Sequence, residues 1–112
     1  MRTLLFALAA LIATPVHAED WARRSAERDV ILHDFRFASG ETMDINLHVT
    51  TLGTPHRGPD GKIDNAVMVL HGTGGSGHQF FRPQFADELY GKGRPLDITR
   101  YYVILPDNIG HG

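Results

Sequence analysis

The sequence predicts an α/β protein in which a β-hairpin precedes a strand–helix–strand unit, so that the sheet is mixed. Two stretches of alternating apolar and polar residues, 31–37 and 43–49, flank a turn that contains Gly40. A continuous apolar run, 66–70, is typical of a strand that is buried on both faces. A helical pattern from Pro83 and a β-rich run at 101–105 come next. Two buried strands that are joined through a helix form a parallel pair.

Length and charge limit the size of the protein and its partners. The 112 residues suffice for one small domain at most. The formal net charge is −2, and lysine and arginine form no cluster, so we expect no nucleic-acid partner. Because the chain has no cysteine, no disulfide can be argued.

Residues 1–18 have the pattern of a secretory signal peptide. Arg2 supplies a positive start, 4–13 is apolar, Pro15 breaks the run, and 16–18 offers small residues before Glu19. The run is shorter than the roughly 20 apolar residues of a membrane-spanning helix. We therefore expect 19–112 to be a partial domain that is periplasmic or secreted, with no stable membrane span after cleavage. An uncleaved anchor is the alternative.

The front of the mature chain predicts a half-buried hairpin. The charged stretch 20–28 predicts a short surface helix or a loose arm. Alternation predicts that each hairpin strand has one buried and one wet face. Glycine and proline in 53–65 predict a loop. The apolar face of the hairpin would carry Ile31, Phe35, Phe37, Met43, Ile45, Leu47 and Val49.

A helix is predicted to begin at Pro83, because proline is favoured at the first helical position. Phe81, Phe85 and Leu89 are four residues apart and would face the core. Two glycines at 91 and 93 would end the helix.

The glycines after residue 70 permit two kinds of chemistry. Gly72, Gly74 and Gly77 match the G-x-G-x-x-G pattern of a dinucleotide-binding oxidoreductase, which is the alternative reading of this chain. Against it, the predicted helix begins six residues after Gly77, whereas a pyrophosphate requires a helix N-terminus there. The other chemistry is acyl transfer, in which backbone N–H groups stabilise an oxyanion by about 2.7–4 kcal/mol per donor.

Two turns resemble those of the α/β-hydrolase superfamily. His71-Gly72-Thr73-Gly74-Gly75 resembles its His-Gly oxyanion turn, and Asp107-x-x-Gly110-x-Gly112 resembles its D-x-x-G-x-G loop. Residues 91–104 resemble the segment before the fourth strand in the homoserine O-acetyltransferase branch. The resemblance runs from about Ile31 to the end of the chain. It implies that the fold is the N-terminal part of an α/β-hydrolase fold.

The resemblance also implies roles for individual residues. Thr73 would offer its backbone N–H to the oxyanion, with Gly74 as a helper. The substrate would be a small-molecule ester or acyl compound in the full-length parent, a serine-dependent hydrolase or acyltransferase. Export favours hydrolysis, because acetyl-CoA is cytoplasmic. Structural roles fall to His71, Gly72, Asp107, Gly110 and Gly112, and Asp107 would fix its loop because the family's catalytic acid comes later.

None of the catalytic triad is present, because no G-x-S-x-G elbow occurs in the sequence. Ser76 lies in the wrong turn to serve as the nucleophile. We therefore expect this chain to be the front part of a longer enzyme, truncated before the elbow. Alone, it should be catalytically inert and marginally stable. A secreted fragment that binds a partner is a further alternative. We expect His111 to be exposed. No cofactor and no metal site are predicted, because ligand spacing is absent among His33, His48, His56 and His78.

Overall fold

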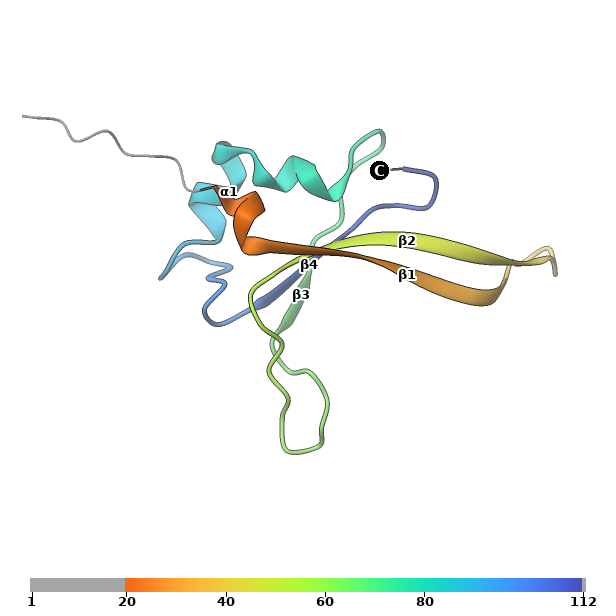
Figure 1. The fold of residues 1–112 in the computed structure, drawn as a ribbon, viewed down its shortest axis with the longest axis horizontal. Coiled ribbons are helices and arrows are strands. Elements are labelled where there is room, and N and C mark those ends of the chain that lie inside the picture. The colour runs from red at the N-terminus through yellow and green to blue at the C-terminus, as the bar shows by residue number, and fades with distance from the viewer. Residues whose placement is uncertain (1–19, 112) are drawn as a thin grey trace, which may run out of the picture.

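The computed structural model describes residues 20–111, so the predicted signal peptide and Gly112 lie outside the described residues. The hairpin projects to one side, and the helical segments gather over the other end of the sheet (Figure 1). The elements in chain order are the 3₁₀ helix η1 (Trp21–Arg24), strands β1 (Ser25–Arg36), β2 (Thr42–Leu52) and β3 (Ala66–Met68), the 3₁₀ helix η2 (Gly77–Phe81), helix α1 (Pro83–Leu89) and strand β4 (Tyr102–Pro106).

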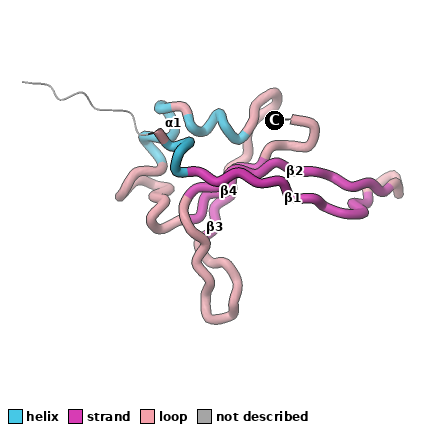
Figure 2. The backbone as a smooth tube through the Cα atoms, in the orientation of Figure 1, coloured by secondary structure: helices cyan, strands magenta, loops and turns pink. Residues whose placement is uncertain are grey.

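The four strands form one mixed sheet in the order β1-β2-β4-β3. β1 pairs with β2 and β2 pairs with β4 in antiparallel fashion, whereas β3 and β4 are parallel. The predicted order of hairpin, strand, helix and strand is therefore confirmed, as is the mixed sheet. Figure 2 shows the helical segments on one side of these strands. No helix among residues 20–111 is long and apolar enough to cross a bilayer.

The predicted buried face of the hairpin is wrong for its outer half. Ile31 is 54% exposed and Met43 is 57% exposed, whereas Ile45 and Val49 are buried. The physical reason is that the outer half of the hairpin extends past the helical segments (Figure 1), which leaves its apolar side chains exposed. The strands also shift register between Leu32 and Phe35.

The prediction that 66–70 forms a strand buried on both faces is also wrong. β3 ends at Met68, which is 60% exposed, and Leu70 is 63% exposed. β3 lies at the edge of the sheet and pairs only with β4 in the described part of the chain. An apolar sequence indicates that a strand can be buried, but whether it is buried depends on the strands and helices that pack against it.

The core forms where the helical segments pack on the inner half of the sheet. Trp21 of η1 is buried and its ring lies edge-on to Tyr90, with centroids 5.6 Å apart. Its Nε1 donates a hydrogen bond to Asp87 at 2.8 Å. The start of the described chain is therefore a packed 3₁₀ turn and not a loose arm. The core residues are Trp21, Leu52, Phe80, Ala86, Tyr90, Ile98, Val103 and Leu105.

Helix α1 begins at Pro83 as predicted, and Phe81 and Leu89 of the predicted stripe are partly buried against the core, but Phe85 is not. Ala86 and Tyr90 are buried, whereas Phe85 is 47% exposed. Arg82 is extended, with φ −61° and ψ 137°, and the preceding turn is a 3₁₀ helix. This interruption breaks the four-residue spacing from Phe81, so the α-helical phase is set only from Pro83 onward.

The segment between α1 and β4 is folded around the carboxylate of Asp97. It accepts hydrogen bonds from the backbone N–H of Gly93 at 2.7 Å and from both the N–H and the hydroxyl of Thr99. The Gly93 N–H, and then the Thr99 groups, hold the pKa of Asp97 below its usual range. This loop belongs to the segment that resembles the homoserine O-acetyltransferase branch.

Candidate functional site

The predicted oxyanion turn is a tight turn after β3. Gly75 donates its N–H to the carbonyl oxygen of Gly72 at 3.1 Å, which closes a four-residue turn over 72–75. Gly74, at the third position, has φ +77°. A positive φ at this position is typical of a type II turn and favours glycine. The turn geometry therefore explains the glycine at position 74.

Two backbone donors in this turn are available to a ligand. Gly72, Thr73 and Gly74 are exposed. Within residues 20–111, no group accepts a hydrogen bond from the N–H of Thr73 or of Gly74. The two adjacent amides can thus bind an anion or an oxyanion without first breaking a protein hydrogen bond.

His71 clamps this turn to the loop after β4. Its ring is buried, its Nε2 accepts the backbone N–H of Asn108 at 2.9 Å, and its Nδ1 lies 2.8 Å from the carbonyl oxygen of Gly72. Because a backbone N–H can only donate and a carbonyl can only accept, Nδ1 carries the proton and the ring is neutral. Both ring nitrogens are occupied, so His71 positions the turn and has no free nitrogen for proton transfer.

Asp107 fixes the backbone at Gly77, the last of the glycines that follow β3. Its Oδ1 accepts the N–H of Gly77 at 2.6 Å in a buried hydrogen bond, and its own N–H donates to the carbonyl of His48. The carboxylate therefore fixes the start of η2 against β4 and the hairpin. Gly110 has φ +80° in the turn that follows, and the N–H of His111 donates to the carbonyl of Asn108.

This arrangement disfavours the dinucleotide-binding alternative. A 3₁₀ helix does begin at Gly77, earlier than the helix predicted at Pro83. However, the Gly77 N–H is bound to the Asp107 carboxylate, so a phosphate would meet a negative charge in place of a free donor. A Cβ at Gly77 would lie 2.8 Å from the carbonyl oxygen of Leu105, which shows how closely this backbone approaches β4.

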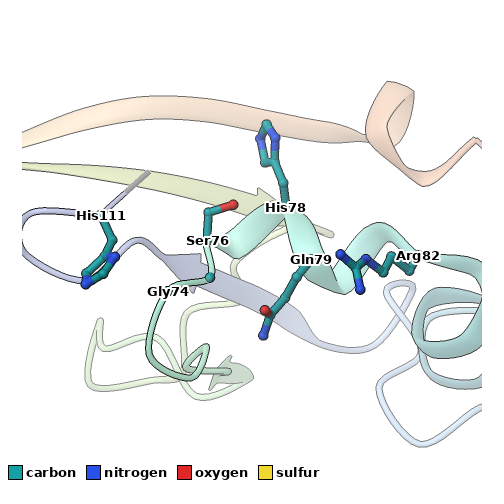
Figure 3. A pocket seen from close by; sticks show the side chains of 7 residues that line it. Gly74, Ser76, His78, Gln79, Arg82 and His111 are labelled. Carbon is teal, nitrogen blue, oxygen red and sulfur yellow. The ribbon is translucent and has the colours of Figure 1, made fainter.

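A polar hollow of about 520 Å³ adjoins the turn. Figure 3 shows Gln79 extending on the side of Gly74, whereas His78 points the other way, toward β1. The hollow is lined by Gly74, Gly75, Ser76, His78, Gln79, Arg82 and His111. A second hollow, of about 360 Å³, shares three of these residues and is lined by His48, Ser76, His78, Asp107 and His111.

Ser76 lines both hollows. Among the described residues, no histidine or carboxylate is hydrogen-bonded to its hydroxyl. A serine nucleophile requires such a partner. His111 is exposed, and its ring centroid is 6.0 Å from that of His71.

Some site residues were missed by sequence reasoning. Asn108, Gln79 and Arg82 carry no motif, and their places depend on the packing of η2 beside the loop after β4. The structure also brings Glu27, His48 and His78 together, although they lie on three elements that are distant in sequence. Gly112, the last position of the predicted loop motif, lies outside the described residues.

Comparisons with known proteins support the predicted resemblance. No protein-family profile matches the chain. The homoserine O-acetyltransferase of Solidesulfovibrio magneticus is 41% identical over 56 residues, which are 44% of this chain and 14% of that protein. The homoserine O-succinyltransferase of Magnetococcus marinus is 30% identical over 73 residues, which are 59% of this chain and 18% of that protein.

A solved structure is similar in fold. The crystal structure of homoserine O-acetyltransferase from Bacillus anthracis superimposes with a TM-score of 0.59 and 24% identity, covering 75% of this chain and 23% of that one. Each match thus covers less than a quarter of the relative's length. The resemblance to the homoserine O-acetyltransferase branch is confirmed, and the fold of this chain matches part of the fold of that solved enzyme.

Proposed function

We propose that residues 20–111 supply the oxyanion-stabilising part of an acyl-transfer enzyme with an α/β-hydrolase fold. The observation that carries this proposal is the pair of exposed, unengaged N–H groups of Thr73 and Gly74 in a turn held rigid from both sides. The substrate class is a small-molecule ester or acyl donor. The relatives are named for O-acylation of homoserine, which supports a small hydroxyl compound as the acceptor.

The chemistry follows from the place of the two donors. When a nucleophile attacks an acyl carbon, negative charge develops on the carbonyl oxygen, and donors that are already oriented stabilise it without reorganisation. The His71 and Asp107 hydrogen bonds keep the turn and the start of η2 in one orientation. The chain is assigned the oxyanion donors and not the nucleophile, because a G-x-S-x-G elbow is not among its 112 residues.

The proposed place of action is outside the cytoplasm. Residues 1–18 carry the signal-peptide pattern, and the acyl-CoA donor of an acetyltransferase is a cytoplasmic compound. We therefore favour water as the acceptor, that is, ester hydrolysis by the complete catalytic unit.

The test uses one substitution that removes a donor while preserving the turn. Thr73 is at the second position of the turn, where proline is common in type II turns. Thr73→Pro therefore removes the N–H and keeps the backbone geometry, whereas Thr73→Ala keeps the N–H and removes only the side chain. Both are made in a chimera in which residues 20–111 replace the equivalent segment of the Bacillus anthracis homoserine O-acetyltransferase.

The chimera is assayed with p-nitrophenyl acetate and with acetyl-CoA plus homoserine. Thr73→Pro is expected to lower kcat by about 10²–10³, because one oxyanion donor is lost. Thr73→Ala is expected to leave kcat near that of the parent chimera. Equal activity of the Thr73→Pro and Thr73→Ala proteins, or a folded chimera without turnover of either substrate, would contradict the proposal.

A further inference from the structure

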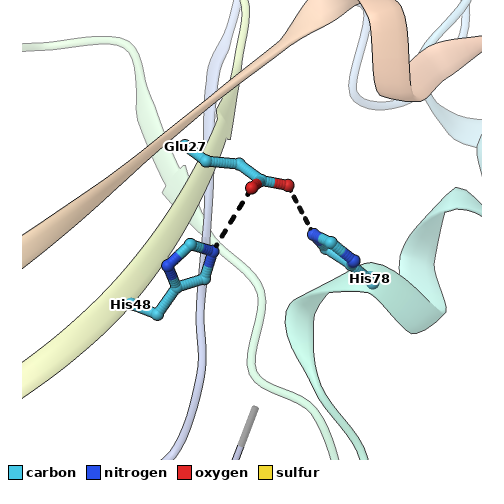
Figure 4. A group of neighbouring side chains, drawn as sticks. All are labelled: Glu27, His48 and His78. Atoms are coloured by element: carbon cyan, nitrogen blue, oxygen red, sulfur yellow. Dashed lines mark hydrogen bonds and ion pairs between the residues drawn. The ribbon is translucent and has the colours of Figure 1, made fainter.

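Three side chains with metal-binding atoms meet on the hairpin side of η2. Glu27 comes from β1, His48 from β2 and His78 from η2, and their ligand atoms all lie within 4.8 Å of one another. Figure 4 shows the Glu27 carboxylate between the two imidazole rings. His78 Nε2 is 2.6 Å from one carboxylate oxygen, and His48 Nε2 is 3.7 Å from the other.

The second nitrogen of His48 is held by another carboxylate. His48 Nδ1 lies 3.1 Å from Oδ1 of Asp29. Because an ionised carboxylate can only accept, Nδ1 donates the proton of this hydrogen bond, which leaves Nε2 as the nitrogen that faces Glu27 and can bind a metal ion in its place. Histidines that bind metals usually have this arrangement, with the far N–H donated to a carboxylate that fixes the ring.

We propose that Glu27, His48 and His78 bind a divalent transition-metal ion of the zinc class, with Asp29 orienting His48. Tetrahedral zinc bonds of about 2.0–2.2 Å place ligand atoms roughly 3.4 Å apart. The distances of 2.6 and 3.7 Å lie on either side of this spacing. All three side chains are at least one-third exposed, so small rotamer changes can bring the atoms to the required distances.

The fourth coordination position would open toward a hollow. His48 and His78 line the 360 Å³ hollow together with Ser76, Asp107 and His111. Two histidines and one carboxylate with an open position are typical of sites that retain a water or substrate, whereas structural zinc sites are closed by four protein ligands. The ion would also link both hairpin strands to η2.

The sequence predicted no metal site, because no two histidines have ligand spacing. That prediction depended on local motifs, whereas these three ligands are 21 and 30 residues apart in the sequence, as the difference of their numbers shows. The proposal is independent of the acyl-transfer function.

The chain contains matched controls for this site. His33 lies 2.9 Å from Asp44, and His56 lies 2.7 Å from Asp64. Both are exposed histidine–carboxylate pairs without a second histidine among the described residues close enough to complete a three-ligand group. If a histidine–carboxylate pair were sufficient, they would bind metal equally well.

The test uses the metal-free 112-residue chain without an affinity tag, titrated with Co²⁺ and then with Zn²⁺. We expect one Co²⁺ per chain, with visible d–d absorption of a low-coordinate site that Zn²⁺ abolishes by displacement. His48→Gln, His78→Gln and Glu27→Gln are each expected to abolish this absorption. Asp29→Asn is expected to weaken binding about 10–100-fold. His33→Gln and His56→Gln are expected to bind as the unsubstituted chain does.

A second measurement covers variants that fail to fold. In NMR spectra of the unsubstituted chain, Zn²⁺ is expected to shift the ring resonances of His48 and His78 and to leave those of His33 and His56 in place. Absence of cobalt absorption and of zinc-dependent ring shifts would overturn the proposal. So would binding that is unchanged in His48→Gln and His78→Gln, or ring shifts at all four histidines alike.

Discussion

The buried hydrogen bond between Asp107 and Gly77 gives the sharpest test of how the start of η2 is held against the loop after β4. Asp107→Ala removes the acceptor that lies 2.6 Å from the Gly77 N–H. Gly77 is buried, so water cannot easily replace the carboxylate. A hydrogen bond to a charged group contributes about 1.5–3 kcal/mol to stability, and an orphaned buried donor costs a similar amount.

Asp107→Asn separates the hydrogen bond from the charge. The asparagine amide has the same shape, and its oxygen can still accept the Gly77 N–H, but the acceptor is neutral. Because charge-assisted hydrogen bonds are roughly twice as strong as neutral ones, we expect about half the loss of the alanine variant.

Urea unfolding followed by tryptophan fluorescence provides the assay. Trp21 is the single tryptophan, and it is buried against Tyr90, so its emission reports on the packed core. With a small-protein m-value of about 1.5 kcal/mol per M, the Asp107→Ala midpoint should fall by about 1–2 M, at an unchanged m-value.

Two results would refute this reasoning. An Asp107→Ala midpoint equal to that of the unsubstituted chain would show that the carboxylate does not hold the start of η2. An Asp107→Asn midpoint as low as that of Asp107→Ala would show that the charge, and not the shape of the acceptor, carries the whole effect.

Three further predictions concern other parts of the chain. Gly53→Ala should lower the unfolding midpoint strongly, because Gly53 has φ +78° and a Cβ would overlap the carbonyl oxygen of Tyr101. Gly61→Ala is the control: Gly61 has φ +77° but lies in open space, so this variant should lose only about 1–2 kcal/mol of stability through backbone strain. Equal losses in the two variants would contradict the steric argument. Burial raises the pKa of Tyr90 to about 12, so the folded state favours the neutral phenol. This contribution to the free energy of unfolding should be complete below pH 10 and lost as the pH rises from 10 through 12. Tyr90→Phe should remove this loss of stability at alkaline pH. The variant should be as stable as the unsubstituted protein at pH 7, because the Tyr90 hydroxyl has no hydrogen-bond partner in the described part of the chain. A clear loss of stability at pH 7, measured by urea unfolding, would show that the hydroxyl does have a partner. In a bacterial host with an intact export system, mass spectrometry should find a mature chain that begins at Glu19, and Ala18→Arg should block this cleavage. If both the unsubstituted chain and the variant remained unprocessed, the signal-peptide prediction would be contradicted.

The success of sequence reasoning varied with the range of the interaction. The start of α1 at Pro83 was predictable, because proline at the first helical position is a local preference. The turn at Gly74 was predictable for the same kind of reason, since its positive φ favours glycine. The burial of Ile31, Met68 and Phe85 was predicted wrongly, because alternation or spacing identifies a possible face but not the element that covers it.

The candidate site divides in the same way. The His-Gly turn and the Asp107 loop were visible as motifs, and the fold implied by their resemblance is confirmed. Their coupling was not visible, because the His71–Asn108 hydrogen bond joins residues 37 positions apart. The Glu27, His48 and His78 group has no local pattern at all, since antiparallel pairing of β1 with β2 and the packing of η2 bring it together.

The amino-acid sequence by itself determined the order of the elements, the backbone turns that require glycine and the family resemblance, because each depends on residues that are close along the chain. The tertiary structure decided which apolar faces are covered, which amides have no hydrogen-bond partner among the described residues and which histidines meet a shared carboxylate. These depend on distances between segments that are remote in sequence, and hydrophobicity and spacing do not encode such distances locally.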